Sequence, residues 1–397
     1  MEGGGGGGGG DAHGGRVPGR LLRVRARFRL SDGAAGAVRG ATPGHAAHLG
    51  PGGLAGARRS VHGCLSPVVA RRLAADRPDG AGAVEPGAGA RGAAVAGDAG
   101  AVRGGDGGGV SDRAVVVVRA GALTTVQDRG RPGHAHLGVP CSGALDLPAA
   151  ALANRLVGND PGAAVLETTL TGCALRPRRA VTVAVGGAHG PVRVDGRPAA
   201  WGAPVRVPAG ALLDVGRAVS GVRGYVALAG GIAVAPVLGS RSTDLLSGLG
   251  PPPVTDGTVL PLGPPSGVPA RTDGALPWPA PPGELVLRVR FGPRADWFTG
   301  EALRTFVSGG YRVAAAGNRI GLRTEGPALA RARGEELPSE GMVLGAVQVP
   351  PDGRPVVFLA DHPTTGGYPV IAVVDARDLP AAAQAPPGTP LRFVPLG

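Results

Sequence analysis

The stretch LADHPTTGGYPVIAVV, residues 359 to 374, places a polar, glycine-containing segment between two apolar runs. The flanking runs, Val356 to Leu359 and Val370 to Val374, are rich in β-branched residues and have the length of strands. A Gly-Gly pair between such runs is ordinary turn chemistry. The stretch therefore predicts two β-strands and the connection that joins them.

The same connection gathers polar side chains, because Asp361, His362, Thr364 and Thr365 all lie beside its two glycines. Glycine lets another molecule approach the backbone closely. The connection is therefore either a plain link between strands or part of a binding site. The residues of this stretch alone leave both interpretations open.

Short apolar runs of the same kind recur from residue 115 to the end of the sequence. In the first half they are Val115 to Arg119, Val181 to Val185, Val205 to Val207, Leu212 to Val215 and Val222 to Ala229. In the second half they are Leu285 to Phe291, Met342 to Val349, Val356 to Leu359, Val370 to Val374 and Leu391 to Val394. Many short strands at close spacing favour barrels or sandwiches. We predict a mainly β protein with a few helices (α+β) and two β-barrel-like domains.

One amphipathic helix is expected in DLPAAALANRLVGND, residues 146 to 160. Asp146 can accept hydrogen bonds from the first turn, Pro148 is tolerated there, and Gly158 can supply the left-handed stop. The predicted buried stripe consists of Ala150, Ala153, Leu156 and Val157. A second helix is expected within residues 299 to 310.

The N-terminal region has a different composition. Residues 1 to 109 contain 32 of the 74 glycines and a single aromatic residue, Phe28. Such a segment cannot bury enough apolar surface to offset its ordering entropy, so we predict a disordered tail. Val110 could be an initiating codon read internally as valine, in which case the tail comes from a gene start placed too early.

A Pro/Gly-rich segment, residues 264 to 284, reads as a linker. It separates a predicted N-terminal β-rich domain, residues 110 to 270, from a predicted C-terminal β-barrel domain, residues 284 to 397.

Charge and cysteine content exclude several functional classes. The chain has a net charge of +12, but the tail, with 14 arginines against 8 acidic residues, carries half of that excess, so nucleic acid is not an expected partner. No apolar run approaches the roughly 18 residues of a membrane span, and no secretory apolar core is present at the N-terminus. The three cysteines, Cys64, Cys141 and Cys173, form no CxxC pair, which fits a reducing cytoplasm.

The chain contains no lysine. It therefore cannot carry a GxxxxGK[ST] phosphate loop, a Schiff-base lysine or covalently attached biotin. Arginine must supply any fixed positive charge at a site.

Residues 124 to 146, TTVQDRGRPGHAHLGVPCSGALD, form a polar, glycine-punctuated loop before the first helix. Arg129 and Arg131 could clamp a carboxylate or phosphate, or they could pair with Asp128 in a surface turn. His134 and His136 have the spacing of metal ligands on a strand, but no acidic residue follows at the spacing a metal site needs, so no metal is expected.

Further candidates are spread along the chain. Arg241, with Ser242 and Thr243, has donors suited to an anion, although the hydroxyls could instead cap a helix. Asn318, Arg319 and Arg323 surround Gly321, and Glu340 and Gln348 mark the ends of an apolar run.

Taken together, these segments resemble one family. The motifs that carry the resemblance are GALTTVQDRGRPGHAHLGVPCSGALD, ALANRLVGND, AVLETTLTG, GVRGYVALAGGI, LGSRST, NRIGLRTEGP, SEGMVLGAVQVPPDGRPVV and LADHPTTGGYPVIAVV. From about residue 114 onward the chain resembles the C subunits of bacterial ATP-dependent 5-oxoprolinases, within the wider biotin-dependent carboxyltransferase, or allophanate hydrolase subunit 2, family. Where the family motif ADxQTTGGYP has Gln, this chain has Pro363, which removes a side-chain amide contact.

The resemblance implies a carboxyltransferase-type first domain, a cyclophilin-like barrel as the second, and partner subunits A and B. It implies a cytoplasmic hydrolase that converts 5-oxo-L-proline, ATP and water to L-glutamate, ADP and phosphate. ATP and Mg²⁺ are the expected cofactors, bound in whole or in part by the partners.

Site residues are expected in three roles. The catalytic candidates are Asp128, Arg129, Arg131 and Asp361. The substrate-binding candidates are Ser142, Arg241, Ser242, Thr243, Gln348, Thr364, Thr365 and Tyr368. The nucleotide-binding candidates are Arg319, Gly366 and Gly367. In this hypothesis Arg241, Ser242 and Thr243 hold the substrate carboxylate, while Arg129 and Arg131 neutralise a phosphoryl group.

Two alternatives stay open. The same site could pass a carboxyl group from biotin on a separate carrier protein to urea or a related amide. The protein could also be a non-enzymatic regulator that binds a partner such as a kinase.

Overall fold

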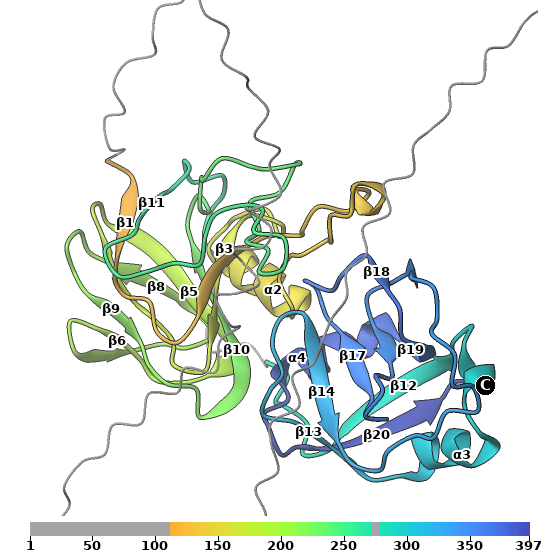
Figure 1. Cartoon of the computed structure of the whole chain (residues 1–397). Helices are drawn as coiled ribbons and strands as arrows, with labels where there is room; N and C mark the ends of the chain where they lie inside the picture. Colours follow the sequence, from red (N-terminus) through yellow and green to blue (C-terminus); the bar gives the residue numbers. More distant parts are fainter. Residues whose placement is uncertain (1–111, 271–277) are drawn as a thin grey trace, which may run out of the picture. The chain divides into compact units, whose positions relative to one another are not determined.

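The computed structural model describes residues 112–270 and 278–397, which fall within one compact unit of the chain. The described residues are mainly β, with three α-helices (Figure 1). The predicted tail, the proposed start at Val110 and Cys64 lie outside the described residues. None of the described helices is both long enough and apolar enough to cross a membrane.

The first part of the fold, called here the sheet half, consists of two antiparallel sheets. The six-stranded sheet has, in order, β11 (Val259–Pro261), β1 (Ala114–Arg119), β4 (Ala174–Pro177), β9 (Leu213–Val215), β6 (Val192–Val194) and β7 (Arg197–Ala199). The five-stranded sheet has β2 (Thr124–Gln127), β3 (Val165–Thr169), β10 (Ser220–Leu228), β5 (Val181–His189) and β8 (Pro204–Val207).

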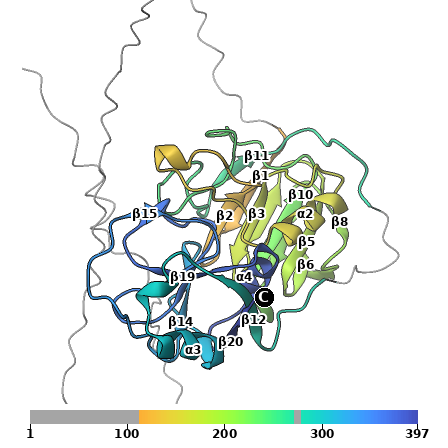
Figure 2. The same cartoon turned by 90° about the vertical axis from the view of Figure 1, so that its right-hand side faces the viewer.

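Helix α2 (Leu147–Leu156) contacts β5 and β10 of the five-stranded sheet, as Figure 2 shows. Asp146 caps it by accepting a hydrogen bond from the backbone N–H of Ala149, and Gly158 follows with φ 77°. The predicted stripe of Ala150, Ala153, Leu156 and Val157 is buried in the core of this half. The cap, the stop and the buried face are thus confirmed.

The second part, called here the barrel half, contains a closed barrel of seven strands. Their order is β12 (Leu285–Phe291), β19 (Val370–Val374), β16 (Ala346–Gln348), β17 (Val356–Phe358), β14 (Gly321–Glu325), β13 (Tyr311–Val313) and β20 (Pro390–Pro395). The pairing of β12 with β20 is parallel, and the other pairings are antiparallel. The mainly β class and a closed barrel in the second half are therefore confirmed.

Two helices accompany the barrel. Thr299 caps α3 (Gly300–Ser308), within the range predicted for the second helix. The α3 residue Phe306 stacks on Phe393 of β20, with ring centroids 4.4 Å apart. Helix α4 (Leu379–Gln384) contacts both β12 and β10. Short 3-10 turns complete the elements: η1 (Ala135–Leu137), η2 (Ala295–Trp297) and η3 (Ala376–Asp378).

One predicted strand is interrupted. The sequence predicts a continuous strand over Met342 to Val349, but only Ala346–Gln348 forms β16, and β15 (Glu340–Gly341) lies before it. Between them Gly345 adopts φ 81° and donates its N–H to the carbonyl of Phe358. A residue in the left-handed region breaks the regular extension of a strand, so the apolar run divides there.

The connection between the two runs of residues 359 to 374 is more than a hairpin turn. β17 and β19 do not pair with each other but lie on opposite sides of β16. Within the connection, β18 (Thr365–Gly366) pairs with β15 to form a separate two-stranded sheet. The turn between the apolar runs is therefore a structured segment of its own.

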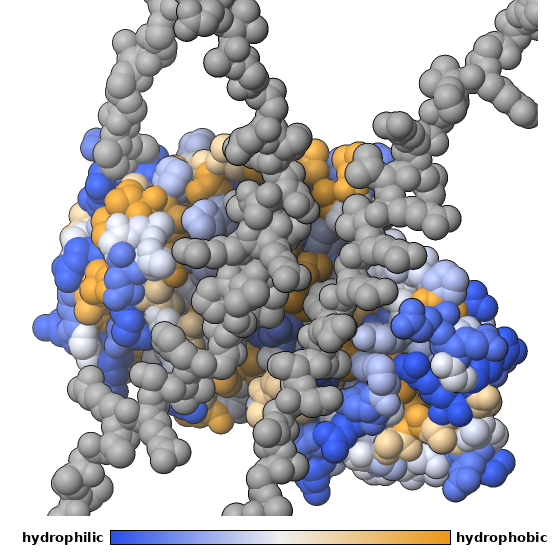
Figure 3. All heavy atoms as spheres, in the orientation of Figure 1, coloured by the Kyte–Doolittle hydropathy of each residue, from blue (hydrophilic) through white to orange (hydrophobic). Residues whose placement is uncertain are grey.

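The exposed surface mixes polar and apolar side chains over both halves, as Figure 3 shows for one face. Among the described residues, the most exposed large apolar side chains are Leu137, Val219, Val268, Phe291 and Val343. Leu137 lies on η1, which has no buried residue and projects from the sheets in Figure 1. The predicted loop of residues 124 to 146 thus contains an exposed arm as well as buried segments.

Candidate functional site

Asp128 organises the loop that follows β2. Its carboxylate accepts hydrogen bonds from the hydroxyls of Ser240 and Ser242, at 2.5 and 2.6 Å, and from the backbone N–H groups of Arg241 and Gly130, at 2.6 and 2.8 Å. Four donors occupy most of the lone pairs that a carboxylate offers. Asp128 therefore ties the 128–131 loop to the segment of residues 240 to 242.

Arg131 lies inside this loop junction with 1% of its surface exposed. Its Nη2 donates to the carbonyl of Ser242, and its Nε donates to the carbonyl of Val237 at 3.4 Å. Its Nη1 is buried without a partner, and no carboxylate among the described residues forms an ion pair with it. A buried charge is normally paired, because its desolvation costs several kcal/mol. Arg131 is thus a buried cation suited to an anion.

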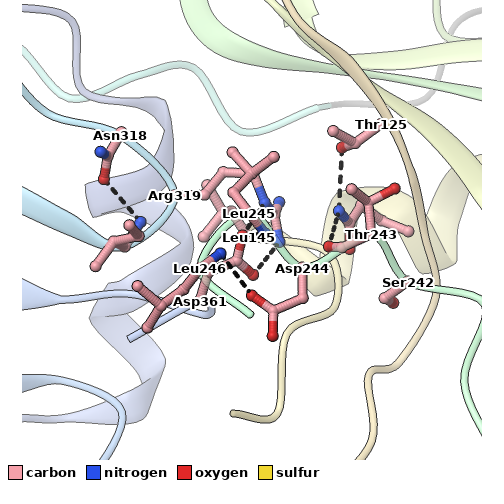
Figure 4. Close-up of polar contacts among 12 residues, drawn as sticks. Thr125, Leu145, Ser242, Thr243, Asp244, Leu245, Leu246, Asn318, Arg319 and Asp361 are labelled. Carbon is pink, nitrogen blue, oxygen red and sulfur yellow. Dashed lines mark hydrogen bonds and ion pairs between the residues drawn. The ribbon is translucent and has the colours of Figure 1, made fainter. Parts of the chain in front are cut away.

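Three more side chains in the same segments carry buried, unpartnered polar atoms. These atoms are Gln127 Oε1, Ser142 Oγ and Thr243 Oγ1. The Gln127 amide is oriented by its Nε2, which donates at 3.0 Å to both the Thr243 carbonyl and Thr125 Oγ1 (Figure 4). Because the carbonyl can only accept, the nitrogen must face it, and Oε1 is the free atom.

Ser142 stands out by its backbone as well. Its φ is 52°, a left-handed conformation that is uncommon for residues other than Gly, Asn and Asp. Its N–H donates to the carbonyl of Ala360 at 3.0 Å, and the preceding carbonyl, of Cys141, accepts from the N–H of Arg131 at 2.7 Å. Strained residues of this kind persist where the surroundings over-determine them, often at functional sites.

A second buried arginine, Arg319, joins the two halves. Its guanidinium binds Asp361 with two hydrogen bonds, of 2.9 and 3.0 Å, also pairs with Glu167 of β3, and donates to the carbonyl of Gly143 at 2.7 Å. All three charged side chains are buried. Burial alone would raise the pKa of Glu167, but the guanidinium groups of Arg319 and Arg223 hold that pKa below its usual value.

Around Glu167 the polar groups continue into a network. Its Oε2 accepts from the hydroxyl of Tyr225 at 3.0 Å and from the N–H of Leu145 at 2.9 Å. The same hydroxyl accepts from the N–H of Asp146 at 2.7 Å. Burial raises the pKa of Tyr225 well above its usual value, and the charge on Glu167 adds to that effect. This phenol therefore stays protonated and holds the start of α2.

Gln384 extends the network from α4 in the barrel half. Its Nε2 donates to Asp146 Oδ2 and to the carbonyl of Arg223, both at 2.9 Å. Its Oε1 accepts from the N–H groups of Val222 and Arg223 at 3.1 and 3.0 Å. Burial raises the pKa of Asp146 above its usual value. One side chain thus satisfies four groups of the sheet half.

His362 follows Ala360, which is bonded to Ser142, and Asp361, which is bonded to Leu245. Its Nδ1 lies 2.8 Å from the carbonyl of Pro363, so Nδ1 carries the hydrogen and Nε2 is left as the acceptor. The ring stacks on Phe358, and burial lowers its pKa. The neighbouring Asp361 accepts from the N–H of Leu245 at 3.2 Å. His362 is therefore a neutral imidazole in a fixed tautomer at neutral pH.

Residues 137–395 match the family described as carboxyltransferase domain, subdomain A and B. The chain belongs to this family. It is 38% identical over 283 residues to the 5-oxoprolinase C subunit of Escherichia coli (strain K12), a match that covers 70% of this chain and 90% of the relative.

Two further relatives are larger proteins. The urea amidolyase of Saccharomyces cerevisiae is 34% identical over 308 residues, which cover 71% of this chain but 17% of the relative. The crystal structure of TTHA0988 superimposes with a TM-score of 0.64 and 41% identity, over 71% of this chain and 55% of that chain. This chain therefore spans little more than half of TTHA0988.

Within this carboxyltransferase-family fold, the predicted site residues fall into two groups. The first group includes Asp128, Arg131, Ser142, Arg241, Ser242 and Thr243, together with Asp361 and Arg319 on the segments beside them. The second group lies at the small sheet of β15 and β18, where Gln348 Nε2 donates to the carbonyl of Tyr368 at 3.0 Å. It includes Thr364, Thr365, Tyr368, Gly366 and Gly367.

The other predicted site arginines, Arg129, Arg241 and Arg319, are either exposed or bonded to acceptors of the protein. Arg129 has 60% of its side chain exposed and lies 3.4 Å from the exposed Asp160. Arg241 Nε donates to the carbonyl of Val234 at 2.8 Å. Arg319 has four of its five N–H hydrogens directed at protein acceptors. Of these cations, Arg131 is the one that is both buried and without a carboxylate.

The two histidines of the exposed arm lie on one short segment. The rings of His134 and His136 are 6.5 Å apart on the η1 segment. No group of three metal-ligating side chains occurs among the residues that the structure describes.

Sequence reasoning missed Glu167, Tyr225 and Gln384. The available signal was a glutamate within an otherwise uncharged strand, AVLETTLTG, since a charge inside a buried strand needs a partner. That partner, Arg319, is 152 residues away in the chain.

Proposed function

We propose that this chain is the C subunit of an ATP-dependent 5-oxoprolinase, which opens the lactam of 5-oxo-L-proline to give L-glutamate. The 38% identity to a 5-oxoprolinase C subunit along most of that relative supports the assignment. Subunits A and B are its proposed partners, and the cytoplasm its proposed location.

The single observation that carries the proposal on the structural side is Arg131. A buried guanidinium with a free Nη1 and no carboxylate among the described residues suits the carboxylate of 5-oxoproline. The hydroxyls of Ser240 and Ser242 are already bonded to Asp128. We therefore assign the carboxylate to Arg131, and we assign Asp128 the task of holding the two loop segments together.

The predicted carboxylates in the described part of the chain do not fit a Mg²⁺–nucleotide site. Asp128 and Asp361, the carboxylates predicted for this role, accept four hydrogen bonds and an arginine pair, respectively. Carboxylates that bind Mg²⁺ need free oxygens. ATP and Mg²⁺ are accordingly assigned to the partner subunits, and Arg319, with its donors used by the protein, to positioning rather than to nucleotide binding.

The second candidate is transfer of a biotin-borne carboxyl group to urea or a related amide. It is supported by the family and by the 34% identity to a urea amidolyase. Urea itself is neutral, so in this alternative Arg131 would bind the carboxyl group carried by biotin, and the identity to a 5-oxoprolinase C subunit is what favours 5-oxoproline. Because the chain contains no lysine, biotin would have to arrive on a carrier protein.

The test uses the full chain purified with the products of its neighbouring genes. ADP and glutamate formation that requires 5-oxoproline and every subunit is the expected result. In that assay Arg131→Gln should raise the KM for 5-oxoproline by roughly 10- to 100-fold, the loss of a charge-assisted hydrogen bond.

Arg179→Gln is the control, because it changes an exposed arginine outside all of the predicted site residues. Its KM should stay at the wild-type value. Biotin-dependent turnover of urea, with no response to 5-oxoproline, would replace the proposal with carboxyl transfer. Silence with both substrates would leave the regulator hypothesis.

A further inference from the structure

Within the loops that contact the Arg131 loop, three buried side-chain atoms have no partner when the carboxylate is assigned to Arg131. They are one acceptor, Gln127 Oε1, and two hydroxyls, Ser142 Oγ and Thr243 Oγ1. Leaving a polar group buried without a partner costs free energy, so native proteins keep few such groups. Three of them in the segments bonded to the loop of an unpaired buried arginine point to a ligand with matching polar groups.

The atoms belong to segments that are bonded to one another. Gln127 Nε2 donates to the Thr243 carbonyl at 3.0 Å, and the Thr243 N–H donates to the carbonyl of Val126 at 2.8 Å. Arg131 binds the carbonyl of Ser242, which precedes Thr243. The Arg131 N–H also binds the carbonyl of Cys141, which precedes Ser142. All four side chains therefore come from one set of contacting loops.

The combination of donors and an acceptor restricts the chemistry of the ligand. A carboxylate or a fully ionised phosphate group offers only acceptors, so either would leave Gln127 Oε1 unpaired. A ring amide has its N–H and C=O on the same edge, because the ring forces the cis arrangement. Such an edge supplies a donor for Gln127 and an acceptor for the two hydroxyls.

We propose that Gln127, Ser142 and Thr243 form an amide-reading subsite beside Arg131. Gln127 Oε1 accepts the amide N–H, and the Ser142 and Thr243 hydroxyls donate to the amide oxygen. This inference rests on the proposed function and deepens it, since the amide edge and the carboxylate together describe a five-membered lactam acid. Urea presents the same N–H and C=O edge without the carboxylate, so the two sources share this subsite and differ at Arg131.

The first test compares two Thr→Val substitutions in the complete complex. In Thr243→Val a hydroxyl without a protein partner is lost, so the unfolding midpoint should stay or rise, while the KM for 5-oxoproline rises roughly tenfold. The matched control is Thr324→Val, in the barrel, where the buried hydroxyl donates to the carbonyl of Pro355 at 2.7 Å. There the midpoint should fall and the KM should not change.

An unchanged KM in Thr243→Val, in a complex that turns over 5-oxoproline, would overturn the subsite. If Thr243→Val does not fold, Ser142→Ala takes its place, with the same expected rise in KM and the same contradicting result.

The second test changes the ligand instead of the protein. N-methyl-5-oxoproline lacks the N–H, so as a competitive inhibitor it should bind roughly tenfold more weakly than 5-oxoproline. Equal binding would overturn the role of Gln127. If the complex ignores 5-oxoproline but uses urea, the proposed function has failed. The amide subsite is then supported by a raised urea KM in Thr243→Val and overturned by an unchanged one.

Discussion

Two buried arginines of this protein differ in what surrounds them. Arg319 has no exposed surface and binds two carboxylates and a backbone carbonyl. Arg131 is buried to nearly the same degree, yet its described acceptors are backbone carbonyls only, and its Nη1 has no partner. Burial alone therefore does not separate Arg319 from the arginine that we propose binds a ligand; the two differ in whether a carboxylate pairs with them.

The two arginines also have different roles in the fold. Arg319 donates hydrogen bonds to Glu167 of β3 in the sheet half and to Asp361 in the barrel half, and so joins the two halves. Arg131 has an Nη1 without a partner, and its loop is tied to residues 240 to 242 by the hydrogen bonds of Asp128. A preorganised loop lowers the entropy that a ligand must lose on binding. The first arginine stabilises the arrangement in which the second one can act.

The largest effect is expected from Arg319→Met. It leaves Glu167 and Asp361 buried without their cation, which should lower the free energy of unfolding by about 3 to 5 kcal/mol. Urea denaturation of the full chain measures this change. The control is Arg179→Met, whose partner Asp112 is exposed, so its stability should stay near the wild-type value. Equal losses in the two variants would contradict the structural role of Arg319.

The next effect concerns ligand-induced stabilisation. At a 5-oxoproline concentration of 100 times Kd, the wild type should gain about 2.7 kcal/mol of stability. Arg131→Gln should gain far less, although its stability without ligand stays close to that of the wild type. Denaturation with and without 5-oxoproline tests both points, and Arg179→Gln should respond like the wild type. Stabilisation of Arg131→Gln by 5-oxoproline to the same extent as the wild type would contradict the assignment of the carboxylate to Arg131.

A smaller effect should appear at acidic pH through His362. Burial lowers its folded-state pKa below the usual 6.5, so protonation favours the unfolded chain. Its contribution to stability is complete above pH 6.5 and is lost as the pH falls toward the lowered value. His362→Gln should therefore lose less stability than the wild type between pH 7.5 and 5.5. The two Asp residues whose charges act on this ring, Asp361 and Asp244, stay present in both proteins.

The smallest effect is expected in the rate of thiol labelling, measured in a Cys64→Ser background. Cys141 is exposed beside the Arg131 loop, whereas Cys173 is buried and has its pKa raised to about 12 by that burial. Iodoacetamide should modify Cys141 and spare Cys173, as measured by mass spectrometry. In Arg319→Met the labelling of Cys173 should accelerate, and an unchanged rate there would show that the core of the sheet half does not depend on Arg319.

Much of the fold could be predicted from local pattern. Leu285–Phe291 and Val370–Val374 form strands with the predicted bounds, and Asp146 caps α2 as its position suggested. The division of the run at Gly345 was not predictable, because hydrophobicity does not report a left-handed glycine. The predicted domain boundaries stay predictions.

The candidate site was predictable in its residue types but not in its pairings. Asp128, Arg131 and Ser142 were expected in a functional loop, and Arg241 to Thr243 in another. That Ser242 would donate to Asp128, 114 residues away, depends on the tertiary fold. So does the identity of the atoms left without partners, which decides what a ligand can bind.

The parallel pairing of β12 with β20 has a consequence for the synthesis of the protein. The two strands that close the barrel are its first and its last in the sequence. On the ribosome, the preceding strands wait unclosed until Pro390–Pro395 emerges, and pairing between distant segments is slow to form. Gln384 of α4 emerges just before this strand and completes the hydrogen bonds of Val222 and Arg223. Closure of the barrel therefore waits for β20, and pauses before this strand emerges would extend the time for which the barrel edges are open to aggregation.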